Sequence, residues 1–168
     1  LDILSSKTAG LGSINSSLDN DGIIRKIPLF VRLKSDGKFS NEVFPTLSVE
    51  ALRVAQKAST YLLKSPGASG ENAFGKNLGL QQIRVGRLKV PTNGSGQIWL
   101  HDTGHIPERY VSAVDVIESQ FLGQKIKGNI VLVGTSASGL KDIRSTPLEP
   151  AIAGVEIHAM AIEQMMLG

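Results

Sequence analysis

The sequence predicts an α/β fold, in which helices cover a mixed β-sheet within a single compact domain. Three observations favour it: period-two alternation over 23–33, helical periodicity over 45–63 and 155–167, and a run over 130–133 that is apolar on both faces. A strand buried on both faces needs helices on either side of its sheet. At 168 residues, 41% of them hydrophobic and 20% charged, the chain is long enough to enclose one core.

The first half is expected to begin with a β-hairpin over 11–33, whose turn is the sequence Asp-Asn-Asp-Gly at 19–22. A helix is expected over 45–63, with Glu50 on the polar side opposite an apolar stripe. The stripe consists of Leu47, Ala51, Val54, Ala55, Ala58, Tyr61 and Leu62. A loop over 64–77 follows, then a strand over 83–90, a turn over 91–96 and a short strand over 97–100.

The second half is expected to continue with helix, strand and helix. Ser112 starts the first of these helices, with Asp115 in the capping-box position. Its buried side is expected to hold Ala113, Val116, Ile117 and Phe121. A strand over 129–133 leads into a loop of Gly and Ser over 134–139, and Gly154 precedes the last helix. In that helix one face is shared by Val155, His158, Ala159, Ile162 and Met166.

Composition narrows the class of protein. There is no cysteine, which excludes disulfides, thiolate zinc sites and cysteine nucleophiles. The net charge is only +3 and the basic residues are spread along the chain, so we expect no nucleic-acid partner. No apolar run reaches the length of a membrane span. Because the chain starts without methionine and stops inside a helical pattern, we expect it to be part of a larger protein whose flanks hold membrane spans.

The loop over 134–139 is compatible with several kinds of site. Around Ser136 the nucleophile-elbow pattern lacks its second glycine, and the glycine patterns of the phosphate-binding loops are absent. Two interpretations stay open. The loop is a ligand site beyond the carboxyl end of a strand, or it is a glycine turn whose hydroxyls satisfy backbone groups.

Other polar groups favour structural roles. Asp19-x-Asp21-Gly22 does not match a calcium loop in either alignment and is better interpreted as a hairpin turn. His101-Asp102-x-x-His105 lies in a Gly- and Pro-containing segment and matches no metal motif. His158 is expected to be a core histidine that bonds to a loop. We therefore assign no metal, no cofactor and no catalytic residue.

Two blocks of the sequence resemble a known family. The segment "GSINSSLDNDGIIRKIPL" at 12–29 resembles the hairpin of type-2 CHASE domains. The segments "YVSAVDVI" (110–117), "LGQKIKGNIVLVGTSASGLKDIRSTP" (122–147) and "GVEIHAMAIEQMM" (154–166) are similar to that family's second block. Motif residues that match are Asn15, Asp19, Asp21, Gly22, Arg25, Pro28, Gly134, Ser136, Ala137, Gly139, Asp142, Thr146, Pro147, Gly154, Glu156 and His158.

The resemblance implies that residues 1–168 form an extracytoplasmic sensor domain of a bacterial membrane receptor, periplasmic or on the cell surface. It implies membrane spans on both sides, a homodimer and a cytoplasmic kinase or nucleotide cyclase. The signal, a small molecule or an environmental change, is undefined. Residues expected to bind a ligand or couple the signal are Asn15, Asp19, Arg25, Gly134, Ser136, Ala137, Gly139, Asp142, Thr146 and His158.

In this hypothesis a signal bound near 134–147, or at a subunit contact, shifts the helix over 155–166. Two departures from the family pattern bear on the ligand. Residues 1–11 are too few to hold the segment that usually precedes the hairpin in this family, and "IWLHDTG" at 98–104 stands where the family more often has a tyrosine-containing motif. The alternatives are a hydrolase-like or nucleotide-binding enzyme that uses the 134–139 loop, and a dimerisation module without a ligand.

Overall fold

The computed structural model describes residues 3, 6–35, 38–65, 79–118, 123, 126–135 and 142–168. Its strands are β1 (Lys26–Pro28), β2 (Phe30–Ser35), β3 (Lys38–Pro45), β4 (Tyr61–Lys64), β5 (Gln82–Val85), β6 (Leu88–Pro91), β7 (Gln97–Trp99), β8 (Ile143–Arg144) and β9 (Ile152–Ala153). Its helices are α2 (Leu47–Ala55), the 3-10 turn η1 (Pro107–Arg109), α3 (Ala113–Ile117) and α4 (Gly154–Leu167).

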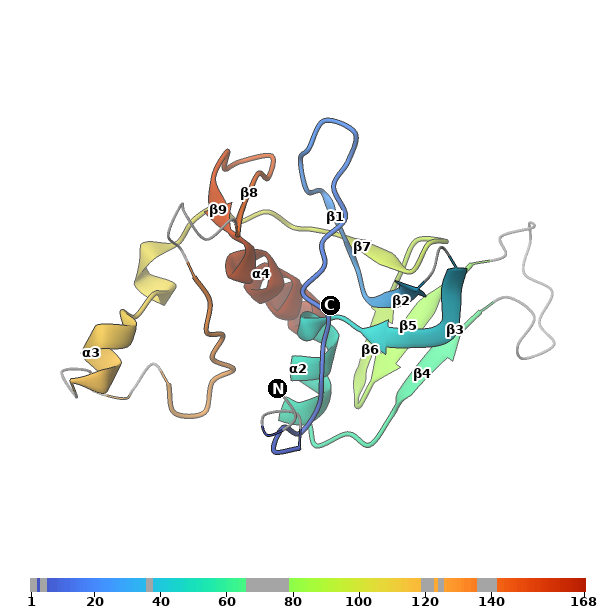
Figure 1. Cartoon of the computed structure of the whole chain (residues 1–168), viewed down its shortest axis with the longest axis horizontal. Coiled ribbons are helices and arrows are strands. Elements are labelled where there is room, and N and C mark those ends of the chain that lie inside the picture. Colours follow the sequence, from blue (N-terminus) through green and yellow to red (C-terminus); the bar gives the residue numbers. More distant parts are fainter. Residues whose placement is uncertain are drawn as a thin grey trace.

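The α/β class and the compact domain are confirmed, but the sheet is divided. Among the described residues there are four small antiparallel sheets: β1 with β7, β2 with β3, β4 with β5 and β6, and β8 with β9. Parallel pairing is limited to isolated bridges such as Ser13 with Thr46 and Ile23 with Ser145. The sheets lie around a central pair of helices, α2 and α4, which pack against each other (Figure 1).

The core forms where this helix pair meets β1, β5 and β7. Ile27 of β1, Val49 of α2 and Ile83 of β5 are fully buried, and Ile157 of α4 is 1% exposed. Burying a side chain of this size contributes about 1.5–3 kcal/mol relative to leaving it exposed. The bounds of the last helix were correctly predicted, since α4 spans Gly154–Leu167. Of the five residues expected on one apolar face only His158 and Ile162 are buried, and Met166 is 56% exposed. The helix buries six of its side chains. Those six are Ile157, His158, Met160, Ala161, Ile162 and Met165.

Helix α2 is shorter than predicted because its end is capped by a side chain. The Gln56 amide donates to the carbonyls of Leu52 and Val85, both at 3.1 Å, and Lys57 adopts a positive φ of 53°. The chain then enters β4, so Tyr61 lies on a strand and its ring meets Phe30 edge-on. An amphipathic repeat does not reveal such a reversal, because residues of a short strand can continue a helical stripe by chance.

Two predicted strands differ from the structure. The strand over 83–90 is a hairpin, in which Gly86 at φ +55° joins β5 to β6. The predicted hairpin over 11–33 keeps its turn, where the Gly22 N–H donates to the Asp19 carbonyl at 2.9 Å. Its first arm contributes the bridge from Ser17 to Lys26 and a hydrogen bond from the Asp19 N–H to the Ile23 carbonyl at 3.1 Å. The second arm pairs elsewhere, β1 with β7 and β2 with β3.

The strand predicted over 129–133 is wrong. In the described stretch 126–135 no residue belongs to a strand. Ile130 and Leu132 pack against the core, whereas Val131 is 49% exposed and Val133 is 93% exposed. The segment keeps the alternation of a strand, but among the described residues no other strand pairs with it.

Helix α3 begins after Ser112 as predicted, without a side-chain cap hydrogen bond and without a buried residue. Val116 is 43% exposed and Ile117 is 80% exposed, so the expected buried side is wrong for these residues. Figure 1 shows α3 at a distance from the α2–α4 pair. Phe121 and most of the predicted 64–77 loop lie outside the described residues. No helix in the described part of the chain is long and apolar enough to cross a membrane.

Replacing Gly12 tests how the N-terminal segment is held. Gly12 lies against the start of α2, where a Cβ would come within 2.7 Å of the Leu47 Cα and 2.9 Å of its nitrogen. Backbone atoms cannot move aside cheaply, so we expect Gly12→Ala to lower the free energy of unfolding by about 1–3 kcal/mol.

The matched control is Gly94→Ala, because nothing lies within 4 Å of a Cβ there. We expect that variant to change stability by less than about 1 kcal/mol. Urea denaturation of both variants measures the difference. Equal stability of the two would contradict the close packing of Gly12 on α2.

Candidate functional site

The predicted site residues fall into three clusters: the acidic turn, the surroundings of His158 and the segment before α4. Ser136, Ala137 and Gly139 lie outside the described residues. Asn15 joins none of the clusters. It is exposed, and its backbone N–H donates to the Ser13 hydroxyl at 3.2 Å.

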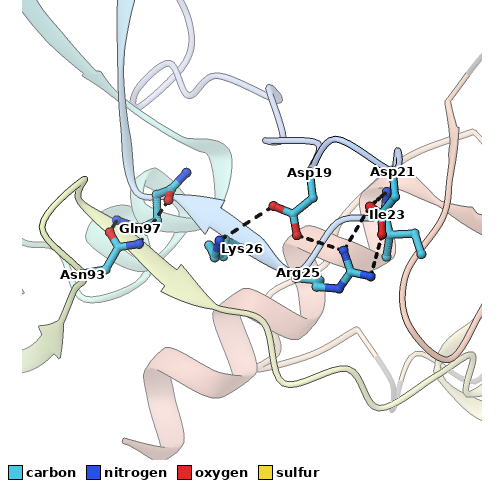
Figure 2. Close-up of polar contacts among 7 residues, drawn as sticks. All are labelled: Asp19, Asp21, Ile23, Arg25, Lys26, Asn93 and Gln97. Atoms are coloured by element: carbon cyan, nitrogen blue, oxygen red, sulfur yellow. Dashed lines mark hydrogen bonds and ion pairs between the residues drawn. The ribbon is translucent and has the colours of Figure 1, made fainter.

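The acidic turn consists of Asp19, Asp21 and Arg25 (Figure 2). The Arg25 guanidinium donates to both carboxylates, at 3.0 Å to Asp19 Oδ2 and at 3.0 and 2.8 Å to the two oxygens of Asp21. Asp21 also accepts the Ile23 N–H at 3.1 Å. Lys26 lies 3.8 Å from Asp19, and its ammonium stands over the Trp99 ring. The carboxylates that suggested a calcium loop are therefore neutralised by the protein itself, as a structural turn requires.

This turn contacts the second motif block. Ile23 bridges Ser145 in parallel, and the Ile24 N–H donates to the Ser145 carbonyl at 2.8 Å. Ile24 is fully buried. Arg25 thus pairs with both carboxylates of the turn, and the residues that leave the turn, Ile23 and Ile24, contact Ser145 at the end of β8. The sequence showed two separate blocks, and the structure brings them together.

In the second block, Asp142 and Gly154 hold the first turn of α4. The Gly154 N–H donates to the Asp142 carbonyl at 2.8 Å, and a Cβ on Gly154 would collide with the Asp142 carboxylate. Asp142 Oδ1 lies 3.5 Å from the Arg144 guanidinium. Gly134 packs against the same turn, since a Cβ there would lie 2.5 Å from the Val155 Cβ. Both glycines are required by close approach to α4.

Thr146 is buried and organises the turn that joins β8 to β9. Its backbone N–H donates to the Glu149 carbonyl at 2.8 Å, and its hydroxyl accepts the Glu149 N–H at 3.2 Å. Asp102 reaches the same turn and accepts the Leu148 N–H at 2.8 Å. Burial opposes the ionisation of Asp102, but hydrogen bonds from Leu148, Thr146 and Gly104 outweigh it and lower the pKa of this carboxyl. Asp102 therefore links its own loop, at Gly104, to the turn between β8 and β9, at Leu148.

His158 is a core residue, as predicted. It is 4% exposed, its Nδ1 lies 2.8 Å from the Ser48 hydroxyl, and its Nε2 lies 3.4 Å from the Ile14 carbonyl. A carbonyl only accepts, so Nε2 carries the proton and Ser48 donates to Nδ1. Burial lowers the pKa of His158 from 6.5, partly offset by the hydrogen bond to Ile14 and by the charge of Asp142. The neutral ring therefore ties α4 to α2 and to the N-terminal segment.

Sequence reasoning missed a second group at the start of α4. His105, from the loop interpreted as merely polar, places Nδ1 3.0 Å from the Glu156 carboxylate. Its ring lies 4.8 Å from the Tyr110 ring. A sequence signal for this pair did exist. It was the 101–105 motif taken together with Glu156, the acidic residue in the first turn of the last helix. Among the described residues, no group of three or more acidic or histidine side chains is placed to hold a metal ion.

The pKa of Asp21 gives a direct test of the turn. The hydrogen bond from Arg25 lowers it from 3.8 to about 2. Because the folded pKa is the lower one, Asp21 stabilises the fold above pH 3.8, and this stabilisation is lost as the pH falls from 3.8 towards about 2. In Arg25→Gln we expect the pKa of Asp21 to rise towards 3.8, measured by the carboxyl ¹³C shift. Lys26→Gln is the control, since Lys26 pairs with Asp19 instead; an equal rise in both variants would refute the assignment.

The buried histidine predicts a pH dependence near neutrality. Because the folded pKa of His158 lies below 6.5, the unfolded chain binds a proton first as the pH falls. From about pH 7.5 to about pH 5.5, we expect the free energy of unfolding to decrease by at most about 1.4 kcal/mol per pH unit from this group. His158→Asn should remove that part of the slope, and His101→Asn, at an exposed position, should keep it. Equal slopes in the two variants would show that His158 does not titrate on unfolding.

Comparison with known proteins identifies one family. The CHASE2 domain model matches residues 3–168, which include both motif blocks. No curated protein and no solved structure matches the chain. CHASE2 domains are extracytoplasmic sensory domains. The structural contacts join the two motif blocks at the start of α4, and the family match spans the same blocks: the chain belongs to the CHASE2 domain family.

Proposed function

We propose that this domain is the signal-input part of a bacterial transmembrane receptor and that α4 passes the signal to a cytoplasmic kinase or nucleotide cyclase. The domain would lie outside the cytoplasmic membrane between flanking membrane spans, act as a homodimer and catalyse no reaction itself. The observation that carries the proposal is the contact between Asp142 and Gly154. It joins the family's second block to the first turn of the last helix.

The packing of α4 suits this role. It is buried in the core as far as Met165, whereas Met166 and Leu167 at its end are 56% and 82% exposed. Its polar side chains reach neighbouring loops, with Gln164 bonded to the backbone of Trp99 and His101 and Glu163 paired with Arg109. A change at the start of α4 therefore alters contacts along the whole helix.

Substitution at the start of α4 tests the proposal. Gly154→Ala forces either Asp142 or the helix to move, because the new methyl group overlaps the Asp142 carboxylate. Asp142→Ala removes the carboxylate that lies against Gly154 and pairs with Arg144, and it keeps the backbone hydrogen bond to Gly154. In the full-length receptor, or in a fusion of residues 1–168 through a membrane span to a nucleotide cyclase, we expect each to change basal output by about fivefold or more.

Gly94→Ala is the control, since nothing lies near a Cβ at that position. Purified domains are compared by circular dichroism to show that the variants fold. If Asp142→Ala and Gly154→Ala fold and signal like the wild type under every stimulus tried, α4 does not carry the signal. Turnover of a substrate by the purified wild-type domain would instead favour an enzyme.

A further inference from the structure

A cavity of about 500 Å³ that is open to solvent lies beside the first turn of α4. Its polar wall comes from His105, Tyr110, Glu149 and Glu156. Its apolar wall comes from the strands of the β8–β9 hairpin and the turn between them. The volume falls within the range of about 300–1,000 Å³ that is usual for small-molecule sites.

The charge of this cavity is opposite to that of the chain. The whole protein carries +3, whereas the cavity wall holds two carboxylates. The nearby arginines are engaged elsewhere, Arg109 with Glu163 at 2.9 and 3.0 Å and Arg144 with Asp142 at 3.5 Å. An anionic ligand would therefore meet repulsion here, and a cation would be attracted.

The carboxylates have acceptor capacity to spare. An ionised carboxylate can accept about four hydrogen bonds. Glu149 accepts the His105 N–H at a long 3.4 Å, and Glu156 accepts from the His105 ring at 3.0–3.2 Å. The side chain of Glu156 is only 13% exposed, so a charge brought next to it is poorly screened by water.

The remaining walls favour an organic cation over a metal ion. The side chains of Ile143, Ala151 and Ala153 offer apolar surface without a ligating atom, so a hydrated metal ion would gain nothing from them. Tyr110 offers an aromatic ring, which attracts ammonium groups, and His105 packs against that ring and steadies it. Carboxylates, one aromatic ring and an apolar wall together match an alkylammonium group.

We propose that this cavity binds a small organic cation, a protonated or quaternary amine, between Glu149, Glu156 and Tyr110. The site is assembled from the loop after β7, the β8–β9 hairpin and the first turn of α4. A ligand held there would contact α4 through Glu156. Only this last step, the effect on output, rests on the proposed function; binding itself does not.

The test is titration of the isotopically labelled 168-residue chain with choline chloride and with ethanolamine hydrochloride. We expect saturable NMR shifts in His105, Tyr110 and Glu156 with at least one of these amines. The control for shape is 3,3-dimethylbutanol, which resembles choline without its charge, and sodium chloride controls for ionic strength. Magnesium chloride tests the alternative of a metal ion.

Variants assign the binding to named groups. Glu156→Gln and Glu149→Gln should each weaken amine binding about tenfold, because each removes one charge while keeping the side-chain shape. Tyr110→Leu should weaken it by about two- to fivefold. Asp115→Asn is the charge-matched control, on α3 and outside the cavity, and should bind like the wild type. Thermal unfolding of each variant confirms that it folds.

Four results would overturn the proposal. They are no saturable shift with either amine, equal binding of 3,3-dimethylbutanol, saturation by magnesium alone, and an equal loss of binding in Glu156→Gln and Asp115→Asn. Amine binding that leaves receptor output unchanged supports the site and counts against transmission through α4. The two proposals can therefore fail separately.

Discussion

The burial of α4 against α2 is the constraint on which the rest of the structure depends. Ile157 and Ala161 of α4 are 1% and 0% exposed, and Val49 of α2 is fully buried. The small sheets around this pair have two or three strands each, which are marginal on their own in water. Each sheet gains stability by covering part of the helix pair, so the position of α4 determines where the loops that lead into it can lie.

Polar contacts then set the orientation of α4 at three levels. Asp142 meets the backbone at its first residue, His158 bonds to Ser48 one turn later, and Gln164 bonds to the Trp99 carbonyl near its end. The buried contact is the most demanding of these, because an unpaired imidazole or hydroxyl in the core would cost about 1–3 kcal/mol. The apolar contacts bury the helix, and these hydrogen bonds select one rotation of it.

Sequence patterns correctly predicted those elements of the fold that depend on residues close together in the chain. The turn at 19–22 depends on residues that tolerate positive φ, and the last helix depends on a long apolar repeat. The end of α2 was missed because it depends on Gln56 reaching Val85, 29 positions away. Glu50 was assigned to the polar side, yet it is 7% exposed and bonds to Arg53 and Tyr61. A paired carboxylate can occupy a buried position that hydrophobic patterning reserves for apolar residues.

In the candidate site, too, the sequence motifs identified single residues but not the partners that lie far away in the sequence. The motifs located Asp142, Gly154 and His158, but not their partners, since Ser48 lies 110 positions from His158. His105 and Glu156 meet across 51 positions, so neither residue alone indicated a cavity. The strand prediction at 130–133 failed for a related reason: a continuous run of apolar β-forming residues becomes a strand only where a second strand lies beside it.

The number of hydrogen bonds that each carboxylate already accepts distinguishes structural carboxylates from those that can bind a ligand. Asp21 and Asp102 each accept several hydrogen bonds from the chain, and both have lowered pKa values. Their charges are already stabilised, so a ligand would have to displace protein donors of equal strength. Glu149 and Glu156 face the cavity with fewer donors. A ligand would gain most where carboxylate oxygens keep unused acceptor capacity, because no protein donor has to be displaced there. That condition holds at the first turn of α4, next to the backbone contact between Asp142 and Gly154.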